Sequence, residues 1–453
     1  MTSAGLAAAR TRAARLAPRV GLFGLLGQGN LGNDGSLEAV LGYLRSEHPE
    51  AILDAMCSGP ELVASRYRIP AVHLHRQYPE RRRASGLTGL LRRCAELGLG
   101  AGIDTFRTAS WVRRHDAVIV PGMGVLEVTV PMRPWQTPYS MFLLSLSGRL
   151  FRTKVAYVSA GTNVIHEPVM RWLVTKAASL ARYRSFRDTV SRDAMRQMGL
   201  DTSGDAIYPD VVFSLPVPSN GKEPTGAVGV GIMDYSGTNE DRQEGDKIRS
   251  AYIEKITRFV LWLVDNGRSV RLFTSDTADE PVVSQILADV RAQRPELDPA
   301  RIITESAPSL EELMRQTAEV DIVVASRFHN VLYAMKMGKP TLSLGYAAKH
   351  DDLMADMGMS RFSQPLKSLD VARLIEQFTE LEGQSAWIRL TLAERNAVNA
   401  ELVSRQFAEL SAILFPVGQT GPAGPGQAPV RTGAPFKRSR APFARSQHDD
   451  QRK

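Results

Sequence analysis

The chain is 453 residues long, with 43% hydrophobic and 23% charged residues and a formal net charge of +8. This length exceeds what one core usually organises and predicts two domains, and the composition excludes a fibrous or wholly disordered protein. Two cysteines, Cys57 and Cys94, exclude a disulfide framework, and we predict that both are small buried residues. No stretch reaches the ~18 apolar residues of a spanning helix, and residues 1–18 lack a secretory apolar core, so we expect a cytoplasmic protein.

Basic residues gather at both ends of the chain and in residues 76–110. The leader, residues 1–18, and the Gly-, Pro- and Arg-rich segment 416–453 offer no apolar face to bury, so we predict disordered basic N- and C-terminal tails. Such tails could hold the protein at the anionic inner face of the plasma membrane. No nucleic acid is expected as a partner.

The first predicted element is an apolar strand over residues 20–26, followed by a glycine-containing turn and a helix that Ser36 could cap. These parts resemble the opening of a Rossmann fold, and the glycines would let the backbone approach a ligand closely. The spacing is not GxGxxG and no GK[ST] follows, so neither a dinucleotide site nor a P-loop is predicted. The turn is polar, and we favour a role in positioning sugar hydroxyls over an ordinary capped turn for Asn30, Asn33 and Asp34.

Further buried strands are predicted at residues 51–56, 117–120 and 154–159. Glu127 follows the second of them and could meet substrate or serve as the acid at a helix N terminus. His166 lies in the loop after the third strand. Arg187 stands beside Asp188 and could be a ligand clamp or half of a structural pair. Trp135 could stack on a sugar or belong to the core.

Residues 216–226 contain proline and glycine and are predicted to link a first domain, residues 19–215, to a second, residues 216–380. The second domain alternates strands with helices, at 228–232, 253–264, 270–274, 281–293, 302–304 and 310–314. This alternation predicts a parallel sheet covered on both faces. Two Rossmann-like α/β domains facing a cleft resemble the GT-B architecture of glycosyltransferases. A helical segment over 381–415 is expected to tie the domains together.

Residues 321–346, DIVVASRFHNVLYAMKMGKPTLSLGY, predict a strand, a helix and a second strand. Ser326, Arg327 and His329 lie at the carboxyl end of the first strand, where open α/β sheets bind ligands. A helix N terminus and a guanidinium suit a phosphate or a carboxylate, and an imidazole can move a proton near neutral pH. The alternative is that Arg327 pairs with a structural acid while His329 caps or packs.

Taken together, these motifs resemble the polysaccharide pyruvyl transferase family. The resemblance rests on GNLGNDGSLEAV near the start, YRSFRDTVSRDAM and YPDVVFSLP in the middle, and SRFHNVLYAMKMGKPTLSLGY with Lys349 near the end. It spans roughly residues 19–375. The first motif departs from the usual family pattern, because Asn33 stands where an acid is common and Asp34 follows it.

The resemblance implies transfer of the enolpyruvyl group of phosphoenolpyruvate to a sugar of a cell-surface polysaccharide or lipid-linked glycan precursor. The products would be a pyruvate ketal and phosphate, with the acceptor on the first domain and the donor on the second. We expect donor-binding roles for Arg327, Arg187, Ser326 and Lys349, acceptor-binding roles for Asn30, Asn33, Asp34 and Glu127, and acid–base roles for His329 and His166.

Two other functions fit the same pattern. A GT-B-type glycosyltransferase would use a nucleotide sugar as donor on the same scaffold, because a fold does not fix its function. A non-catalytic glycan-binding protein would need no donor. No cluster of His, Cys or carboxylate residues has metal-ligand spacing, so neither a metal nor another cofactor is expected.

Overall fold

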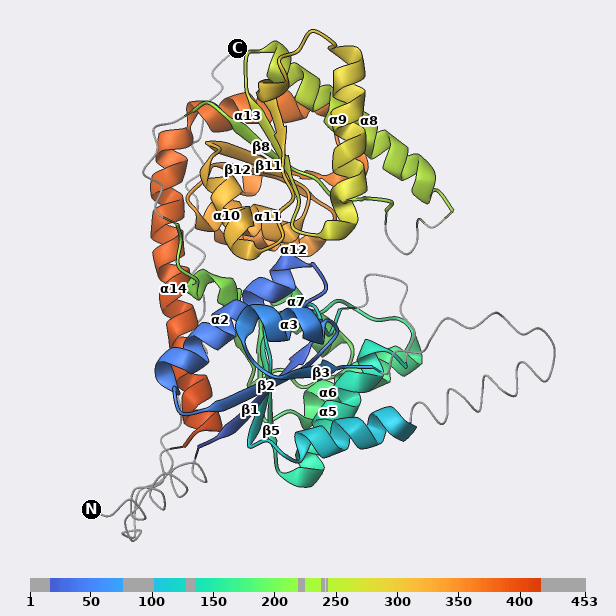
Figure 1. Ribbon diagram of the computed structural model, residues 1–453, viewed down its shortest axis with the longest axis vertical. Helices are drawn as coiled ribbons and strands as arrows, with labels where there is room; N and C mark the ends of the chain where they lie inside the picture. Colours follow the sequence, from blue (N-terminus) through green and yellow to red (C-terminus); the bar gives the residue numbers. More distant parts are fainter. Residues whose placement is uncertain are drawn as a thin grey trace, which may run out of the picture. The chain divides into compact units, whose positions relative to one another are not determined.

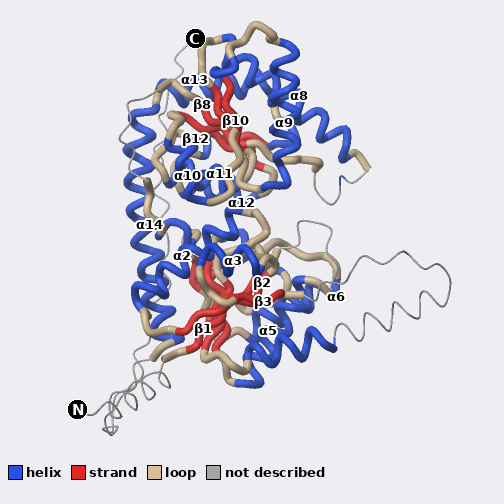
Figure 2. Tube along the Cα trace, in the orientation of Figure 1, coloured by secondary structure: helices blue, strands red, loops and turns tan. Residues whose placement is uncertain are grey.

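The computed structural model describes residues 17–75, 102–127, 135–218, 225–237, 241 and 243–416. Two parallel β-sheets, each flanked by helices, make up this part of the chain (Figures 1 and 2). The predicted tails, apart from residues 17, 18 and 416, and most of the basic segment 76–110 lie outside the described residues, as does Cys94. Cys57 is buried, as predicted.

The first sheet has seven strands in the order β3-β2-β1-β4-β5-β6-β7. They are β1 (Arg19–Gly24), β2 (Ile52–Cys57), β3 (Ala71–His73), β4 (Ala117–Val120), β5 (Lys154–Ala160), β6 (Tyr183–Phe186) and β7 (Ala206–Ile207). Neighbouring strands all pair in parallel, and the first six follow the Rossmann order. Strand β4 is buried throughout, as an apolar run in a sheet with both faces covered should be.

The second sheet repeats this topology with six parallel strands in the order β10-β9-β8-β11-β12-β13. They are β8 (Val228–Gly231), β9 (Val270–Phe273), β10 (Ile302–Thr304), β11 (Ile322–Ala325), β12 (Thr341–Gly345) and β13 (Ser363–Pro365). The predicted alternation of strands and helices in this half is therefore confirmed.

Helices join the strands of each sheet. Those of the first half are α2 (Leu31–Glu47), α3 (Pro60–Tyr67), α5 (Thr137–Phe151), α6 (Pro168–Leu180) and α7 (Thr189–Gln197), with residues 102–112 also helical. Those of the second half are α8 (Gly245–Asp265), α9 (Glu280–Gln293), α10 (Leu310–Ala318), α11 (Phe328–Lys336), α12 (Ala348–Asp356) and α13 (Val371–Gly383). Within the described part, no helix has the length and apolar character to cross a membrane.

The last helix, α14 (Ser385–Leu414), contacts both halves. The side-chain amide of Asn396 donates a 2.9 Å hydrogen bond to the carbonyl of Met335 in α11. Further along, the amide of Gln406 donates to the Ser185 hydroxyl in β6 at 2.7 Å. The helix predicted at the end of the second domain therefore connects the two sheets.

One local prediction in the first half is wrong, and one of two alternatives is excluded. Helix α2 begins at Leu31, because the Asn30 side chain accepts from two backbone N–H groups and caps it, whereas Ser36 lies inside the helix. The Ser36 hydroxyl instead donates to the carbonyl of Gly122 at 2.8 Å. Trp135 precedes α5 and is 61% exposed, which excludes a core position and leaves sugar stacking a prediction.

Candidate functional site

Four titratable side chains from the two halves meet at one place. Glu127 lies in the loop after β4, and Arg187 directly follows β6. His329 and Lys349 belong to the first turns of α11 and α12, which follow β11 and β12. All four therefore come from the carboxyl ends of parallel strands, the edge at which open α/β sheets bind ligands.

The Arg187 guanidinium is buried among three carboxylates. Its nitrogens lie 3.1 Å from Glu127 Oε1, 3.4 Å from Asp188 Oδ2 and 3.6 Å from Asp210 Oδ2. The guanidinium carbon is also 4.6 Å from the centroid of the Phe328 ring, a cation–π contact. Burial alone would lower the pKa of Arg187, but Glu127 and the two aspartates raise it, so the side chain stays charged.

The Glu127 carboxylate lies between two cations. One oxygen contacts Arg187, and the other accepts a 3.0 Å hydrogen bond from the Lys349 ammonium. Burial would raise the pKa of Glu127, but Lys349 and Arg187 outweigh it and lower the pKa to about 2. Burial would likewise lower the pKa of Lys349, and Glu127 raises it. At neutral pH this is a carboxylate bridging a guanidinium and an ammonium.

His329 reaches the same cluster from α11. Its Nε2 atom is buried and has no hydrogen-bond partner among the described residues. Burial lowers the pKa of His329 well below 6.5, and the charges of Arg187 and Lys349 lower it further. The imidazole is therefore neutral near pH 7. A side-chain carbon at Gly32 would overlap this ring, so glycine at that position lets α2 and α11 approach.

Arg327 is held by acids of its own half. Its Nε and Nη2 lie 2.7 and 2.6 Å from the two oxygens of Asp279, and Nη1 lies 3.6 Å from Asp276. The structure thus contains the structural pair that was the alternative for Arg327, while 21% of the side chain is exposed and donor binding stays a prediction. Ser326 is buried, with its hydroxyl 3.1 Å from that of Tyr252.

The three polar residues of the glycine-containing turn hold the turn itself. Asn30 caps α2 and donates a 2.9 Å hydrogen bond to Asp276 in the second half. Asn33 donates to the carbonyl of Leu25 at 3.0 Å. The Asp34 carboxylate is buried, accepts from a backbone N–H of the turn at 2.9 Å, and has its pKa raised by burial. Their acceptor-binding role stays a prediction.

The glycines of this motif approach the second half of the chain rather than open space. The Tyr333 hydroxyl of α11 donates a 3.1 Å hydrogen bond to the Leu31 carbonyl, and a side-chain carbon at Gly35 would overlap that hydroxyl. The Leu31 N–H donates to the carbonyl of Ser275 at 2.9 Å. The close backbone approach expected of GNLGNDG is present, but its neighbour is the second half of the chain, whereas the sequence predicted a ligand.

His166 lies apart from these contacts. It is exposed in the loop before α6, and it has no hydrogen bond or ion pair to the described residues of the cluster. The neighbouring Glu167 caps α6 by accepting from the N–H groups of Val169 and Met170. An acid–base role for His166 stays a prediction.

Sequence reasoning missed three residues of the site. Asp210 belongs to the YPDVVFSLP motif, and its position inside an apolar run was a signal of a buried, paired acid. Phe328 stands within SRFH and packs against both Arg187 and Lys349. Asp279 lies 48 residues before its partner Arg327, and no local pattern marks it.

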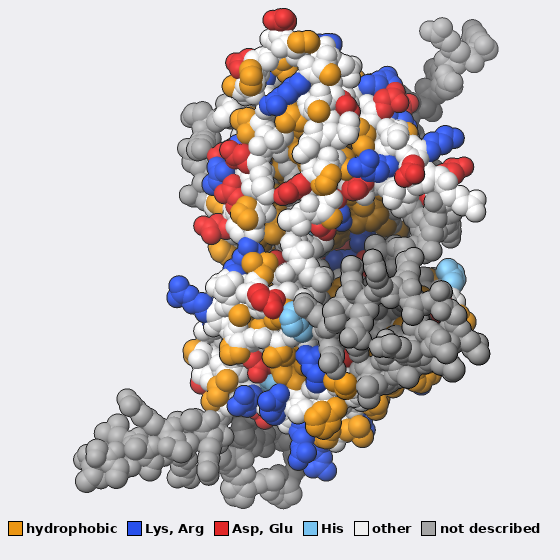
Figure 3. Space-filling view, turned by 45° about the vertical axis from the view of Figure 1, so that its right-hand side comes forward, with side chains coloured by type: hydrophobic (Ala, Val, Ile, Leu, Met, Phe, Trp, Pro, Cys, Tyr) orange, Lys and Arg blue, Asp and Glu red, His pale blue; other side chains and the backbone are white. Residues whose placement is uncertain are grey.

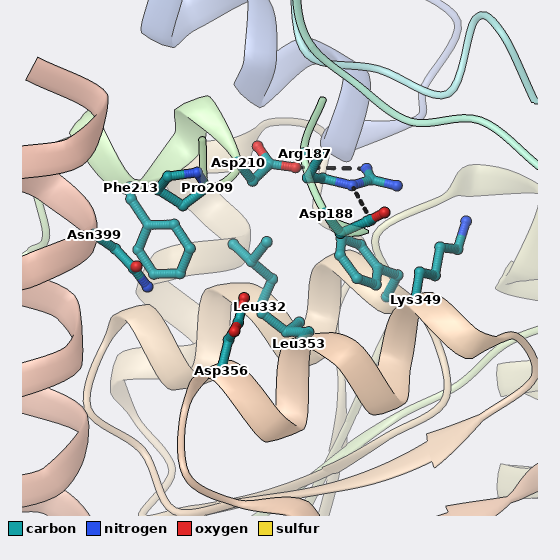
Figure 4. A pocket seen from close by; sticks show the side chains of 11 residues that line it. Arg187, Asp188, Pro209, Asp210, Phe213, Leu332, Lys349, Leu353, Asp356 and Asn399 are labelled. Atoms are coloured by element: carbon teal, nitrogen blue, oxygen red, sulfur yellow. Dashed lines mark hydrogen bonds and ion pairs between the residues drawn. The ribbon is translucent and has the colours of Figure 1, made fainter. Parts of the chain in front are cut away.

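A cavity of about 20 Å³ opens beside Arg187, Asp188 and Lys349 (Figure 4). Both halves line it, through Arg187, Asp188, Pro209, Asp210, Phe213, Phe328, Leu332, Lys349, Leu353, Asp356 and Asn399. This volume holds about one water molecule, so a larger anion enters only if the residues that line the cavity move. Across the described ranges, no three or more His, Cys, Asp or Glu side chains are arranged to hold a metal ion.

A second buried histidine makes stability depend on pH. Burial lowers the pKa of His350 from 6.5 to about 3. Above about pH 6.5 the imidazole is neutral in both the folded and the unfolded protein. Between about pH 6.5 and about pH 3 only the unfolded chain binds the proton, so the free energy of unfolding falls as the pH falls. By about pH 5 the loss from His350 should reach about 2 kcal/mol. Urea unfolding at neutral pH and at about pH 5 measures this loss.

The matched variant for this prediction is His350→Gln, whose side-chain amide can donate to the carbonyl of Ala347 or Ser326, each of which lies 3.2 Å from a ring nitrogen of His350. The variant should lose less free energy of unfolding between neutral pH and about pH 5 than the parent protein does. Equal losses in the two proteins would show that His350 is not kept neutral by the fold.

Comparisons with known proteins agree with this architecture. Anabaena Alr3699/HepE, solved with UDP and glucose, superposes with a TM-score of 0.52 at 11% identity, over 88% of this chain and 100% of that one. Staphylococcus aureus MnaA, solved with UDP, gives 0.55 at 13% identity over 88% and 97%. The Neisseria meningitidis UDP-GlcNAc 2-epimerase gives 0.54 at 12% identity over 86% and 99%. At these identities the likeness shows the fold, which is GT-B-like.

Sequence comparison identifies the family. No curated protein shows significant sequence similarity to the chain. The sequence model of the polysaccharide pyruvyl transferase family matches residues 30–348, which is most of the chain and includes Glu127, Arg187 and His329. The chain therefore belongs to the polysaccharide pyruvyl transferase family.

Proposed function

We propose that the protein transfers the enolpyruvyl group of phosphoenolpyruvate to a sugar of a cell-surface polysaccharide or lipid-linked glycan precursor. Family membership supports a transferase that acts on polysaccharide. The observation that carries the proposal is the Glu127 carboxylate between Arg187 and Lys349. Two cations around one carboxylate are a ready anion site, and phosphoenolpyruvate brings a carboxylate and a phosphate. The reaction would take place in the cytoplasm.

Helix N termini supply further donors for the anionic groups. Neither α11 nor α12 has a side-chain hydrogen bond at its N-cap position, which leaves backbone N–H groups of the first turn for a ligand. Lys349 belongs to that turn of α12. Phosphoenolpyruvate would replace Glu127 as the ion-pair partner of Arg187 and Lys349. The Glu127 carboxylate could then accept a hydrogen bond from a sugar hydroxyl.

The reaction balances with two hydroxyls of one sugar. A proton adds to the methylene carbon of phosphoenolpyruvate, and the first hydroxyl oxygen bonds to the adjacent carbon while losing its proton. The second hydroxyl oxygen then bonds to the same carbon, the bond from that carbon to the phosphate oxygen breaks, and phosphate leaves with a proton. The products are a cyclic pyruvate ketal and phosphate, and no oxidant or reductant is consumed.

His329 suits the proton-accepting half of this reaction. Because its pKa lies well below 6.5, the imidazole is neutral at physiological pH and can accept a proton from the sugar hydroxyl. Its Nε2 atom has no partner among the described residues, so that nitrogen can meet a substrate. A positioned base of this kind typically contributes ~100- to 10,000-fold to the rate.

The second candidate function is sugar transfer from a nucleotide sugar. The observation that favours it is the fold, because HepE and MnaA, which share it, were both solved with UDP. A shared fold does not carry a shared donor. A protein that only binds glycan is the third possibility, and it predicts no product from either donor.

The decisive assay incubates the protein with cell-envelope glycan and either phosphoenolpyruvate or a nucleotide sugar. We expect phosphate release with the first donor and no nucleoside diphosphate release with the second. Phosphoenolpyruvate at about 100 times its dissociation constant should add about 2.7 kcal/mol of apparent stability in a thermal-shift titration. Nucleoside diphosphate release without phosphate release would replace the proposal by its alternative.

Donor binding can be tied to the cluster with one matched pair of variants. Lys349→Met should raise the dissociation constant for phosphoenolpyruvate roughly tenfold or more, because it removes a charge-assisted hydrogen bond. Lys367 pairs with Asp241 outside the cluster, at 2.6 Å, and Lys367→Met should leave the dissociation constant unchanged. Equal affinities of the two variants for phosphoenolpyruvate would show that the donor does not bind at this site.

A further inference from the structure

The first sheet has a basic edge where β4, β5 and β6 begin. Glu127 and Arg187 follow the ends of β4 and β6, so this edge is the opposite one from the candidate site. The segments just before the three strands, residues 113–116, 149–153 and 181–182, contain five arginines and one acid. All five are exposed, and none forms an ion pair with another described residue: Arg113, Arg114, Arg149, Arg152 and Arg182.

Two apolar side chains stand among these arginines. Helix α5 ends in Arg149-Leu150-Phe151, followed by Arg152, and Leu150 is 67% and Phe151 40% exposed. The Arg113 guanidinium lies 5.9 Å from the centroid of the Phe151 ring, so the segments before β4 and β5 are in contact. We call the five arginines with Leu150 and Phe151 the RLFR face. Hydrophobic side chains beside Lys and Arg are visible at the lower end of Figure 3.

We propose that the RLFR face docks the protein on a bilayer surface rich in anionic phospholipid. Guanidinium groups bind phosphate oxygens through two parallel hydrogen bonds, and none of these five is occupied by an acid of the described chain. Exposed Leu and Phe side chains can enter the boundary between headgroups and acyl chains. Apolar insertion alone or a basic patch alone gives only marginal membrane binding, whereas the two together hold a protein at the surface.

The combination of side chains distinguishes a membrane from other anionic partners. A soluble polyanion would use the arginines alone, so its binding would not depend on Leu150 or Phe151. With the face on a bilayer, the carboxyl edge of the first sheet, which carries Glu127 and Arg187, points away from the lipid. The inference stands independently of the donor, because no residue of the face belongs to the candidate site.

The test measures binding of the full-length protein to vesicles by flotation. The vesicles contain either equal parts of phosphatidylglycerol and phosphatidylcholine or phosphatidylcholine alone. We expect binding to the anionic vesicles only, weakened as added salt screens the charges. The double variant Leu150→Ser/Phe151→Ser and the double variant Arg149→Ser/Arg152→Ser should each bind roughly tenfold or more weakly.

The matched control is Leu390→Ser in α14, where a leucine that is 74% exposed also follows an arginine. It should bind vesicles like the parent protein, and all variants should keep the parent melting temperature. Undiminished binding of the Leu150→Ser/Phe151→Ser protein would overturn the proposal, because it would assign the attraction to charge elsewhere in the chain. Equal binding to neutral vesicles, or no binding to either kind, would overturn it as well.

Discussion

Replacing His329 by Gln is expected to lower phosphate release from phosphoenolpyruvate by roughly 100-fold or more while donor binding stays measurable. The imidazole is the neutral, buried group whose Nε2 has no partner among the described residues, so its loss removes a proton acceptor from the site. Glutamine can still donate a hydrogen bond but cannot take up the proton. Calorimetric titration with phosphoenolpyruvate and phosphate-release rates on the folded variant separate the two effects.

The control for His329→Gln is His48→Gln. His48 is half-buried at the end of α2, with its Nε2 2.8 Å from the Ser411 hydroxyl, and has no contact with the cluster. Its substitution should leave turnover unchanged. Near-normal turnover in a folded His329→Gln protein would remove His329 from the mechanism, and His166→Gln would then be the next variant to measure.

Replacing Arg187 by Met is expected to lower the free energy of unfolding by about 3–5 kcal/mol. The substitution leaves three buried or nearly buried carboxylates, on Glu127, Asp188 and Asp210, without their shared cation. Burial already raises the pKa of Asp210, and the loss of Arg187 removes the charge that opposes this rise. Urea unfolding at neutral pH measures the effect, and Arg187→Lys should restore only part of it.

Two further variants show whether the loss comes from unpaired charge. Arg294→Met removes an arginine from an exposed pair with Asp265, and it should change stability little because water screens that pair. Adding Asp210→Asn to Arg187→Met should recover stability, since the buried carboxylate that loses its only charge partner is then neutral, whereas Glu127 keeps Lys349. A loss in Arg187→Met no larger than in Arg294→Met, or no recovery in the double variant, would contradict the prediction.

The sequence by itself determined the two α/β halves. Short apolar runs such as residues 117–120 and 322–325 are buried strands because both faces of a parallel sheet are covered, and this signal is local. The positions of Glu127 and His329 were also predictable, since each follows a predicted strand and ligand sites of open sheets lie after the strands. Strand β6, which precedes Arg187, was not predicted. The start of α2 was not, because Asn30 and Ser36 are both good caps and only the folded backbone chooses between them.

Only the tertiary structure decided the partners of these residues. Lys349 meets Glu127 from a position 222 residues later in the chain, and Arg327 meets Asp279 in the short 3-10 helix after β9. Such pairs depend on which loops of the two sheets come into contact, and no sequence period encodes that. The neutrality of His329 has the same origin, because the burial and the neighbouring cations that lower its pKa exist only once the halves have packed.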